Sequence, residues 1–228
     1  MATIGTHLTQ TTGFRMATVN LDHLVKIEEN PAFAIAYDAQ DIVVADGRPI
    51  TWAARLAGSD IELLPGSDLV VPLCRLAADK GRSIAMIGST EAALCDAAAY
   101  LTAAVPGLKV AYSHAPPMGF DPNGGAAAEV LRSVETSGAG ICFLALGAPK
   151  QEMLAARGAG LAPSVGFASI GAGLDFLGGH QRRAPAWVRA LALEWLWRAL
   201  SSPARMGPRY AKCLAILPGV LWRAWRRQ

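Results

Sequence analysis

Short apolar runs recur along the first 180 residues, and four of them end at a polar or glycine-containing turn. Runs that are apolar throughout are typical of strands buried on both faces of a parallel sheet. The five runs are Asp41–Ala45, Ser83–Ile87, Leu108–Tyr112, Gly140–Leu146 and Val165–Ile170. An earlier strand is expected to end at Thr18-Val19-Asn20.

Helical patterns fill the gaps between these runs. The expected helices are Pro49–Leu56, Asp68–Lys80, Glu91–Ala104, Gly124–Glu135 and Lys150–Arg157. Because strands and helices alternate so densely, the sequence predicts an α/β fold: a Rossmann-like, mostly parallel sheet with helices on both faces.

The pattern changes after Gly178-Gly179-His180, where helical stretches follow without strands. These stretches are Ala186–Leu200 and Ala211–Arg226, and the second is expected to break at Pro218 because proline interrupts a helix. We therefore expect residues 1–180 to form the catalytic core and residues 181–228 to form a basic helical appendage.

The charge of the chain divides at the same place. Residues 1–180 carry 11 Lys/Arg and 17 Asp/Glu, whereas residues 181–228 carry 10 Lys/Arg, one acidic residue and five of the six tryptophans. Such a basic segment points to a polyanionic partner. Its leucines and tryptophans favour a membrane surface, while a nucleic-acid-binding module and an ordinary packed helix pair stay open as alternatives.

Arginines of the appendage are candidates for binding a diphosphate or the membrane surface, because the planar guanidinium group suits bidentate contacts to phosphate. These candidates are Arg183, Arg189, Arg198, Arg205 and Arg209.

Several function classes find little support. The four cysteines form no C-x-x-C pair and no metal-ligand spacing, so we expect reduced thiols and no metal site. Neither a G-x-G-x-x-G fingerprint nor a P-loop occurs, which disfavours a dinucleotide oxidoreductase and a P-loop NTPase. The first fifteen residues are polar and predict no signal peptide. No run of about 18 apolar residues occurs, so no transmembrane helix is expected.

Polar residues follow several of the expected strands, and ligands of open α/β sheets bind outside the carboxyl ends of strands. Asp46 follows the run Asp41–Ala45, so its carboxylate could take a proton from an attacking hydroxyl group. The alternative is that Asp46 caps the next helix. Thr18 and Asn20 could bind a sugar or phosphate, or could form a cap or Asx-turn.

Glycine-containing turns supply the other candidate substrate-binding residues. Gly88-Ser89-Thr90 would present backbone N–H groups at a helix N-terminus, where anions are favoured. The segment Gly147–Glu152 either contacts a donor or begins a capped, solvated helix. The substrate-binding residues predicted at these turns and after the last strand are Gly88, Ser89, Gly147, Pro149, Lys150, Gln151, Glu152, Gly171 and Asp175.

Taken in order, seven motifs resemble the WecG/TagA/CpsF glycosyltransferase family, grouped as glycosyltransferase family 26. They are Thr18-Val19-Asn20, Val43–Gly47, Gly66–Leu69, Gly147–Glu152, Gly171–Gly179, Arg183-Ala184-Pro185 and Glu194–Arg198. The resemblance covers residues 16–210, and the segment Ala115–Phe120 looks more like exopolysaccharide members. Family members often carry an arginine before the glycine that matches Gly66, where this chain has Pro65.

The resemblance implies a GT-E-like fold and an inverting transfer that needs no metal and no cofactor. The implied donor is UDP-N-acetylmannosamine, UDP-glucose or UDP-glucuronate, and the implied acceptor is a polyprenyl-diphosphate-linked saccharide of cell-surface polysaccharide biosynthesis. Asp46 would be the catalytic base, and Thr18, Asn20 and Gln151 would line the active site.

The same resemblance implies a peripheral protein on the cytoplasmic face of the bacterial plasma membrane. No nucleic-acid partner is then expected, and a homo-oligomer is compatible with this interpretation. A non-catalytic scaffold of a polysaccharide assembly complex is the remaining alternative.

Overall fold

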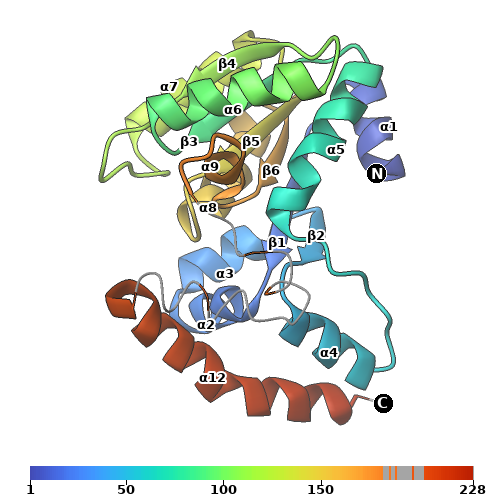
Figure 1. The fold of residues 1–228 in the computed structure, drawn as a ribbon, viewed down its shortest axis with the longest axis vertical. Coiled ribbons are helices and arrows are strands. Elements are labelled where there is room, and N and C mark those ends of the chain that lie inside the picture. The colour runs from blue at the N-terminus through green and yellow to red at the C-terminus, as the bar shows by residue number, and fades with distance from the viewer. Residues whose placement is uncertain (182–184, 186–187, 189–196, 198–202, 228) are drawn as a thin grey trace.

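A six-stranded, all-parallel sheet forms the centre of the molecule (Figure 1). The computed structural model describes residues 1–181, 185, 188, 197 and 203–227. The strands are β1 (Phe14–Val19), β2 (Ile42–Ala45), β3 (Ile84–Gly88), β4 (Val110–His114), β5 (Ile141–Ala145) and β6 (Gly166–Ser169), in the spatial order β2-β1-β6-β5-β3-β4. The sheet confirms the predicted α/β fold class.

Helices cover both faces of this sheet (Figure 1). One face carries α1 (Ala2–Gln10), α5 (Gly66–Asp79), α6 (Glu91–Ala104) and α9 (Gly173–Leu177). The other carries α2 (Leu21–Glu29), α3 (Pro31–Asp38), α7 (Gly125–Thr136) and α8 (Lys150–Leu161). Two further helices, α4 (Arg48–Leu56) and α12 (Pro203–Trp225), lie against each other, and α12 also packs on α2.

Each face of the sheet has its own hydrophobic core. Leu73, Met86 and Leu101 are fully buried in the core under α5 and α6. On the opposite face, Leu131 of α7 and Phe167 of β6 are buried with residues of α8. Burying side chains on both sides of the central strands makes this sheet a rigid support for the loops at its ends.

The burial of the edge strands β2 and β4 differs from the sequence prediction, in which every strand was buried on both faces. Strands β3 and β6 are buried along their whole length, whereas β4 alternates between partly buried and exposed positions. The reason is that β2 and β4 each have a neighbour on one side only. The apolar-run criterion therefore placed β4 at Leu108–Tyr112, two residues early, since its last residues Ser113 and His114 are polar.

Three helices in the first 40 residues were not predicted, namely α1, α2 and α3. Two of them begin at asparagine caps. The side chain of Asn20 accepts a hydrogen bond from the backbone N–H of His23, and Asn30 caps α3, which starts with Pro31. Asparagine at the N-cap and proline at the first helical position are both favourable.

Helix α12 continues through Pro208 and Pro218, so the expected break at Pro218 is wrong. Both prolines lie on the solvent-exposed side of the helix. Water can therefore bond the carbonyl groups that each proline leaves without an intrahelical donor. Most of the helix expected at Ala186–Leu200 lies outside the described residues. Of the helices that the structure describes, none is both long and apolar enough to cross a bilayer.

Candidate active site

The carboxyl ends of the strands come together at one edge of the sheet, where the predicted site residues follow. Strands β3 and β5 are neighbours, but their connections run in opposite directions: β3 leads through α6 to β4, and β5 leads through α8 to β6. Such a switch point in strand order is where open α/β sheets bind their ligands. Gly88 is the last residue of β3 and Ser89 follows it, while Gly147 follows β5.

The turn after β3 lies unusually close to β5. Gly88 has a φ of +120°, and a Cβ atom added there would collide with the backbone of Ala145. Ser89 also takes a left-handed conformation, with a φ of +58°, and its hydroxyl group donates to Oδ1 of Asp175. The other oxygen of Asp175 accepts a hydrogen bond from Gln181, 3.0 Å away. Ser89 and Asp175, both predicted at the site, therefore contact each other.

Replacing Gly88 with alanine tests whether this close approach holds the switch point together. We expect the free energy of unfolding to fall by about 2 kcal/mol, from the strained φ and the clash with Ala145. The matched control is Gly107→Ala, which has a φ of +81° but open space around the added Cβ and should cost about 1 kcal/mol. Urea unfolding of both variants makes the comparison; equal losses would mean that the contact with Ala145 is unimportant.

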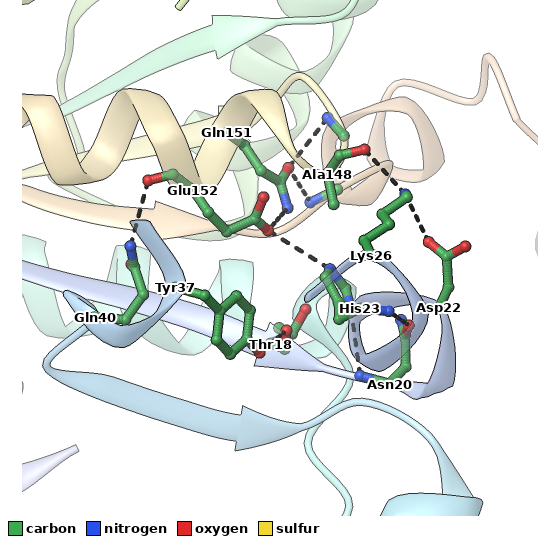
Figure 2. Close-up of polar contacts among 12 residues, drawn as sticks. Thr18, Asn20, Asp22, His23, Lys26, Tyr37, Gln40, Ala148, Gln151 and Glu152 are labelled. Carbon is green, nitrogen blue, oxygen red and sulfur yellow. Dashed lines mark hydrogen bonds and ion pairs between the residues drawn. The ribbon is translucent and has the colours of Figure 1, made fainter. Parts of the chain in front are cut away.

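Gln151 joins the turns that follow β5 and β6 (Figure 2). Its side-chain oxygen accepts hydrogen bonds from the backbone N–H groups of Gly147 and Gly171, each at 3.2 Å. Its amide nitrogen donates to Oε1 of Glu152 at 2.8 Å. Gln151 is 2% exposed and Glu152 is fully buried, so both side chains lie beneath the surface of the site.

Glu152 also faces His23 of α2, whose Nε2 atom lies 3.5 Å from Oε1 (Figure 2). Beside this pair, the hydroxyl group of Tyr37 donates to the carbonyl oxygen of Thr18 at 2.8 Å. Burial, together with the negative charges of Glu152 and Asp46, raises the pKa of Tyr37. The phenol therefore stays protonated and acts as a hydrogen-bond donor.

Asp46 and Thr18 end adjacent strands at the same edge. The pairing of Val19 with Ala45 aligns the ends of β1 and β2, and the backbone N–H of Asp46 donates to the carbonyl oxygen of Val19 at 2.8 Å. Asp46 is partly exposed, whereas Thr18 is 3% exposed. The side chain of Thr18 reaches the start of α5, where a Cβ added to Gly66 would lie 3.2 Å from its Cγ2 atom.

Comparison with known proteins identifies the family to which the chain belongs. The model of the glycosyl transferase WecG/TagA/CpsF family matches residues 1–228. The chain belongs to this family. It is similar to the N-acetylglucosaminyldiphosphoundecaprenol N-acetyl-beta-D-mannosaminyltransferase of Bacillus spizizenii, with 26% identity over 202 residues, which cover 88% of this chain and 76% of that protein. The predicted WecG/TagA/CpsF resemblance is thus confirmed, and the protein is a glycosyltransferase.

In this glycosyltransferase, three ion pairs join α12 to α2. Arg209 lies 2.6 Å from Asp22 of α2, and two outer pairs join Lys212 to Glu29 and Arg223 to Glu28. Burial raises the pKa of Asp22, but the cations of Lys26 and Arg209 outweigh burial and hold this pKa below its usual range. The carboxylate therefore remains charged beside the two cations.

Lys26 extends this contact toward the site. Its Nζ atom lies 2.6 Å from Asp22 and donates at 3.0 Å to the carbonyl oxygen of Ala148, in the turn after β5 (Figure 2). Of the arginines predicted to bind diphosphate, Arg205 and Arg209 belong to α12. Arg183, Arg189 and Arg198 lie outside the described residues.

The structure brings most of the predicted site residues to one edge of the sheet, and it adds His23, Tyr37, Asp22 and Lys26. The signal for His23 was its position three residues after Asn20, where it completes a capping box. The described residues also form a hollow of about 430 Å³ beside α1 and α5 and one of about 520 Å³ beside β4 and α7, but Gly88, Gly147 and Gly171 line neither.

Proposed function

We propose that this glycosyltransferase moves a sugar from a UDP-sugar to a polyprenyl-diphosphate-linked saccharide, with inversion at the anomeric carbon and without a metal ion. The observation that carries the proposal is the gathering of Asp46, Thr18 and the glycine turns at the strand ends of a chain that belongs to the WecG/TagA/CpsF family. The Bacillus spizizenii relative is named for an acceptor sugar attached to diphosphoundecaprenol, which favours a lipid-linked acceptor here too.

In the proposed reaction, Asp46 takes the proton of an acceptor hydroxyl group as the hydroxyl oxygen attacks the anomeric carbon of the donor. The new glycosidic bond forms on the face opposite to the departing group, so the configuration inverts. The bond between the anomeric carbon and the diphosphate breaks, and UDP leaves with the electron pair. A partly exposed carboxylate at the end of β2 suits the role of general base.

In this proposal, the diphosphate of the donor binds beside the Gly88-Ser89 turn. This turn lies at the switch point between β3 and β5 and directly precedes α6, a helix of 14 residues capped by Thr90. Backbone N–H groups at a helix N-terminus favour an anion through hydrogen bonds and the helix dipole. These fixed dipoles would offset the charge that develops on the departing UDP.

We further propose that helix α12 lies at the cytoplasmic surface of the membrane, where the lipid-linked acceptor would be held. Its exposed residues Leu214, Trp222 and Trp225 lie at positions i, i+8 and i+11, which fall on one stripe of a helix. The same helix carries Lys212 and Arg223, which pair with Glu29 and Glu28 of α2 rather than lining this stripe. Tryptophan with basic residues on one helix is typical of a segment that lies in the interface.

Release of UDP from a panel of UDP-sugars tests the proposal directly. The panel contains UDP-N-acetylmannosamine, UDP-glucose and UDP-glucuronate, with a synthetic polyprenyl-diphosphate-linked saccharide and excess EDTA. We expect one donor to release UDP only when the acceptor is present, and chelation to leave the rate unchanged. A rate that EDTA abolishes would contradict the metal-free mechanism. UDP binding without any UDP release would favour the alternative that the protein is a non-catalytic scaffold.

A further inference from the structure

The hydrogen bonds of Gln151 leave its amide little capacity to contact a substrate. Its oxygen accepts from Gly147 and Gly171, and its nitrogen donates to Glu152, so both ends of the amide already have partners. Gly147 and Gly171 have φ values of +73° and +58°. These left-handed turns follow the neighbouring strands β5 and β6, so one side-chain oxygen fixes how the two turns lie relative to each other.

Glu152 determines which way the amide of Gln151 points. An ionised carboxylate only accepts hydrogen bonds, so it requires the nitrogen of Gln151 on its side and leaves the oxygen for the two glycines. Oε2 of Glu152 is buried and has no hydrogen-bond partner within the described residues. A buried charge with incomplete partners is costly, and an apolar residue of similar volume is often as stable or more stable at such a position. Stability therefore does not explain why a carboxylate is here.

His23 completes the arrangement from the side of β1. Its Nδ1 atom lies 3.3 Å from the backbone N–H of Asn20 and accepts that hydrogen bond. The neutral ring therefore carries its proton on Nε2, the atom that faces Glu152. The rings of Phe33 and Tyr37 flank the imidazole. A buried chain of contacts thus runs from Asn20 at the end of β1, through His23 and Glu152, to Gln151 (Figure 2).

We propose that Gln151, Glu152 and His23 are positioning residues that form a buried clamp. The clamp holds the turns at Gly147 and Gly171 together, so that the backbone of these turns, rather than the amide of Gln151, contacts the sugar nucleotide. Exposed fractions of 2%, 0% and 5% keep the three side chains out of reach of a substrate. The assignment of the turns to the sugar nucleotide rests on the proposed function, whereas the clamp itself is a property of the fold.

Exchanging the two neighbouring side chains tests the clamp. In Gln151→Glu, two carboxyl groups face each other where an amide faced Glu152, and at a pH high enough to ionise both, their repulsion should open the contact to the glycines. We expect faster hydrogen exchange at the amides of Gly147 and Gly171 and about a tenfold fall in turnover. In the double variant Gln151→Glu with Glu152→Gln, the new carboxylate accepts from both glycines and from the new amide nitrogen, which takes the place of Oε1 of Glu152 and loses only its 3.5 Å contact with His23. Exchange protection and turnover should both return to within about threefold of the parent protein.

The controls separate the clamp from other causes. Gln10→Glu adds the same charge at an exposed position of α1 and should change neither readout. The amide of Gly138, bonded to Glu135 at the end of α7, serves as the reference for hydrogen exchange measured by NMR. If Gln151→Glu does not fold, Glu152→Met removes the carboxylate that orients the amide of Gln151 without adding charge, and the two glycine amides should again exchange faster.

Each contrary result has a distinct meaning. Unchanged protection of Gly147 and Gly171 in Gln151→Glu would show that the clamp does not exist. Protection restored in the double variant without restored turnover would show that Gln151 contacts the donor itself, and would overturn the positioning role. If the parent protein releases no UDP from any donor, the proposed function fails, while hydrogen exchange still decides whether the clamp exists.

Discussion

Replacing Asp46 with alanine is expected to lower the rate of UDP release at least about a hundredfold while the protein stays folded. A general base in contact with the reacting hydroxyl contributes between about a hundredfold and ten-thousandfold to a rate. Asp46 is partly exposed at the end of β2, next to the end of β1, where an acceptor hydroxyl group could reach it. The same loss is expected for Asp46→Asn, because an amide cannot take the proton.

The matched control for Asp46 is Asp60→Ala. Asp60 lies beyond α4 with its side chain 83% exposed, and it pairs with Arg55 in a surface contact. Such pairs contribute little to stability, so Asp60→Ala should keep full activity. Turnover is measured with the donor identified in the UDP-release panel, and thermal unfolding checks the fold. A folded Asp46→Ala protein that turns over at the parent rate would remove Asp46 as the base.

The sequence was most informative where a single physical signal dominates. Strands β3, β5 and β6 are fully or almost fully buried, so their apolar runs predicted them to within two residues. Helix α6 was predicted with its observed bounds, because Thr90 caps it and its alanines favour a helix. The short helices α2 and α3 lack a long amphipathic repeat, and only their asparagine caps mark where they begin.

The strand order could not be deduced from the sequence. Lys26 and Ala148 are 122 residues apart in the chain, yet their hydrogen bond joins α2 to the turn after β5. Such contacts arise because β1 and β6 are neighbours in the sheet. The sequence also suggested that Lys150, Gln151 and Glu152 are presented together to a donor. The first turn of α8 instead separates them, with Lys150 partly exposed and the other two buried.

The docking of α12 bears on how the appendage would work. Arg209, predicted to bind a diphosphate or the membrane surface, is engaged by Asp22, and Lys26 links this carboxylate to the turn after β5. A phosphate group that attracts Arg209 would compete with the carboxylate of Asp22, because both are acceptors for the same guanidinium group. The boundary near residue 180 stays a prediction.

Replacing both Trp222 and Trp225 with alanine is expected to lower the partition of the protein onto anionic vesicles about a hundredfold. The two indoles are 58% and 53% exposed and lie 5.2 Å apart, so both can enter the headgroup region together. Removing half of each ring from water is worth about 1.5 kcal/mol, or about 3 kcal/mol for the pair, which corresponds to roughly a hundredfold in partition. Thermal stability should not change, because neither ring is buried in the fold.

The control for this pair is Tyr100→Ala, which removes an aromatic ring that is 48% exposed on α6, away from α12. Sedimentation with vesicles of phosphatidylglycerol and phosphatidylcholine measures the partition, and a titration with salt separates the charged contribution from the apolar one. Salt should weaken the parent protein and the double variant by the same factor, since the cations of α12 remain in both. If the double variant sediments as the parent does at every salt concentration, the tryptophans do not enter the membrane.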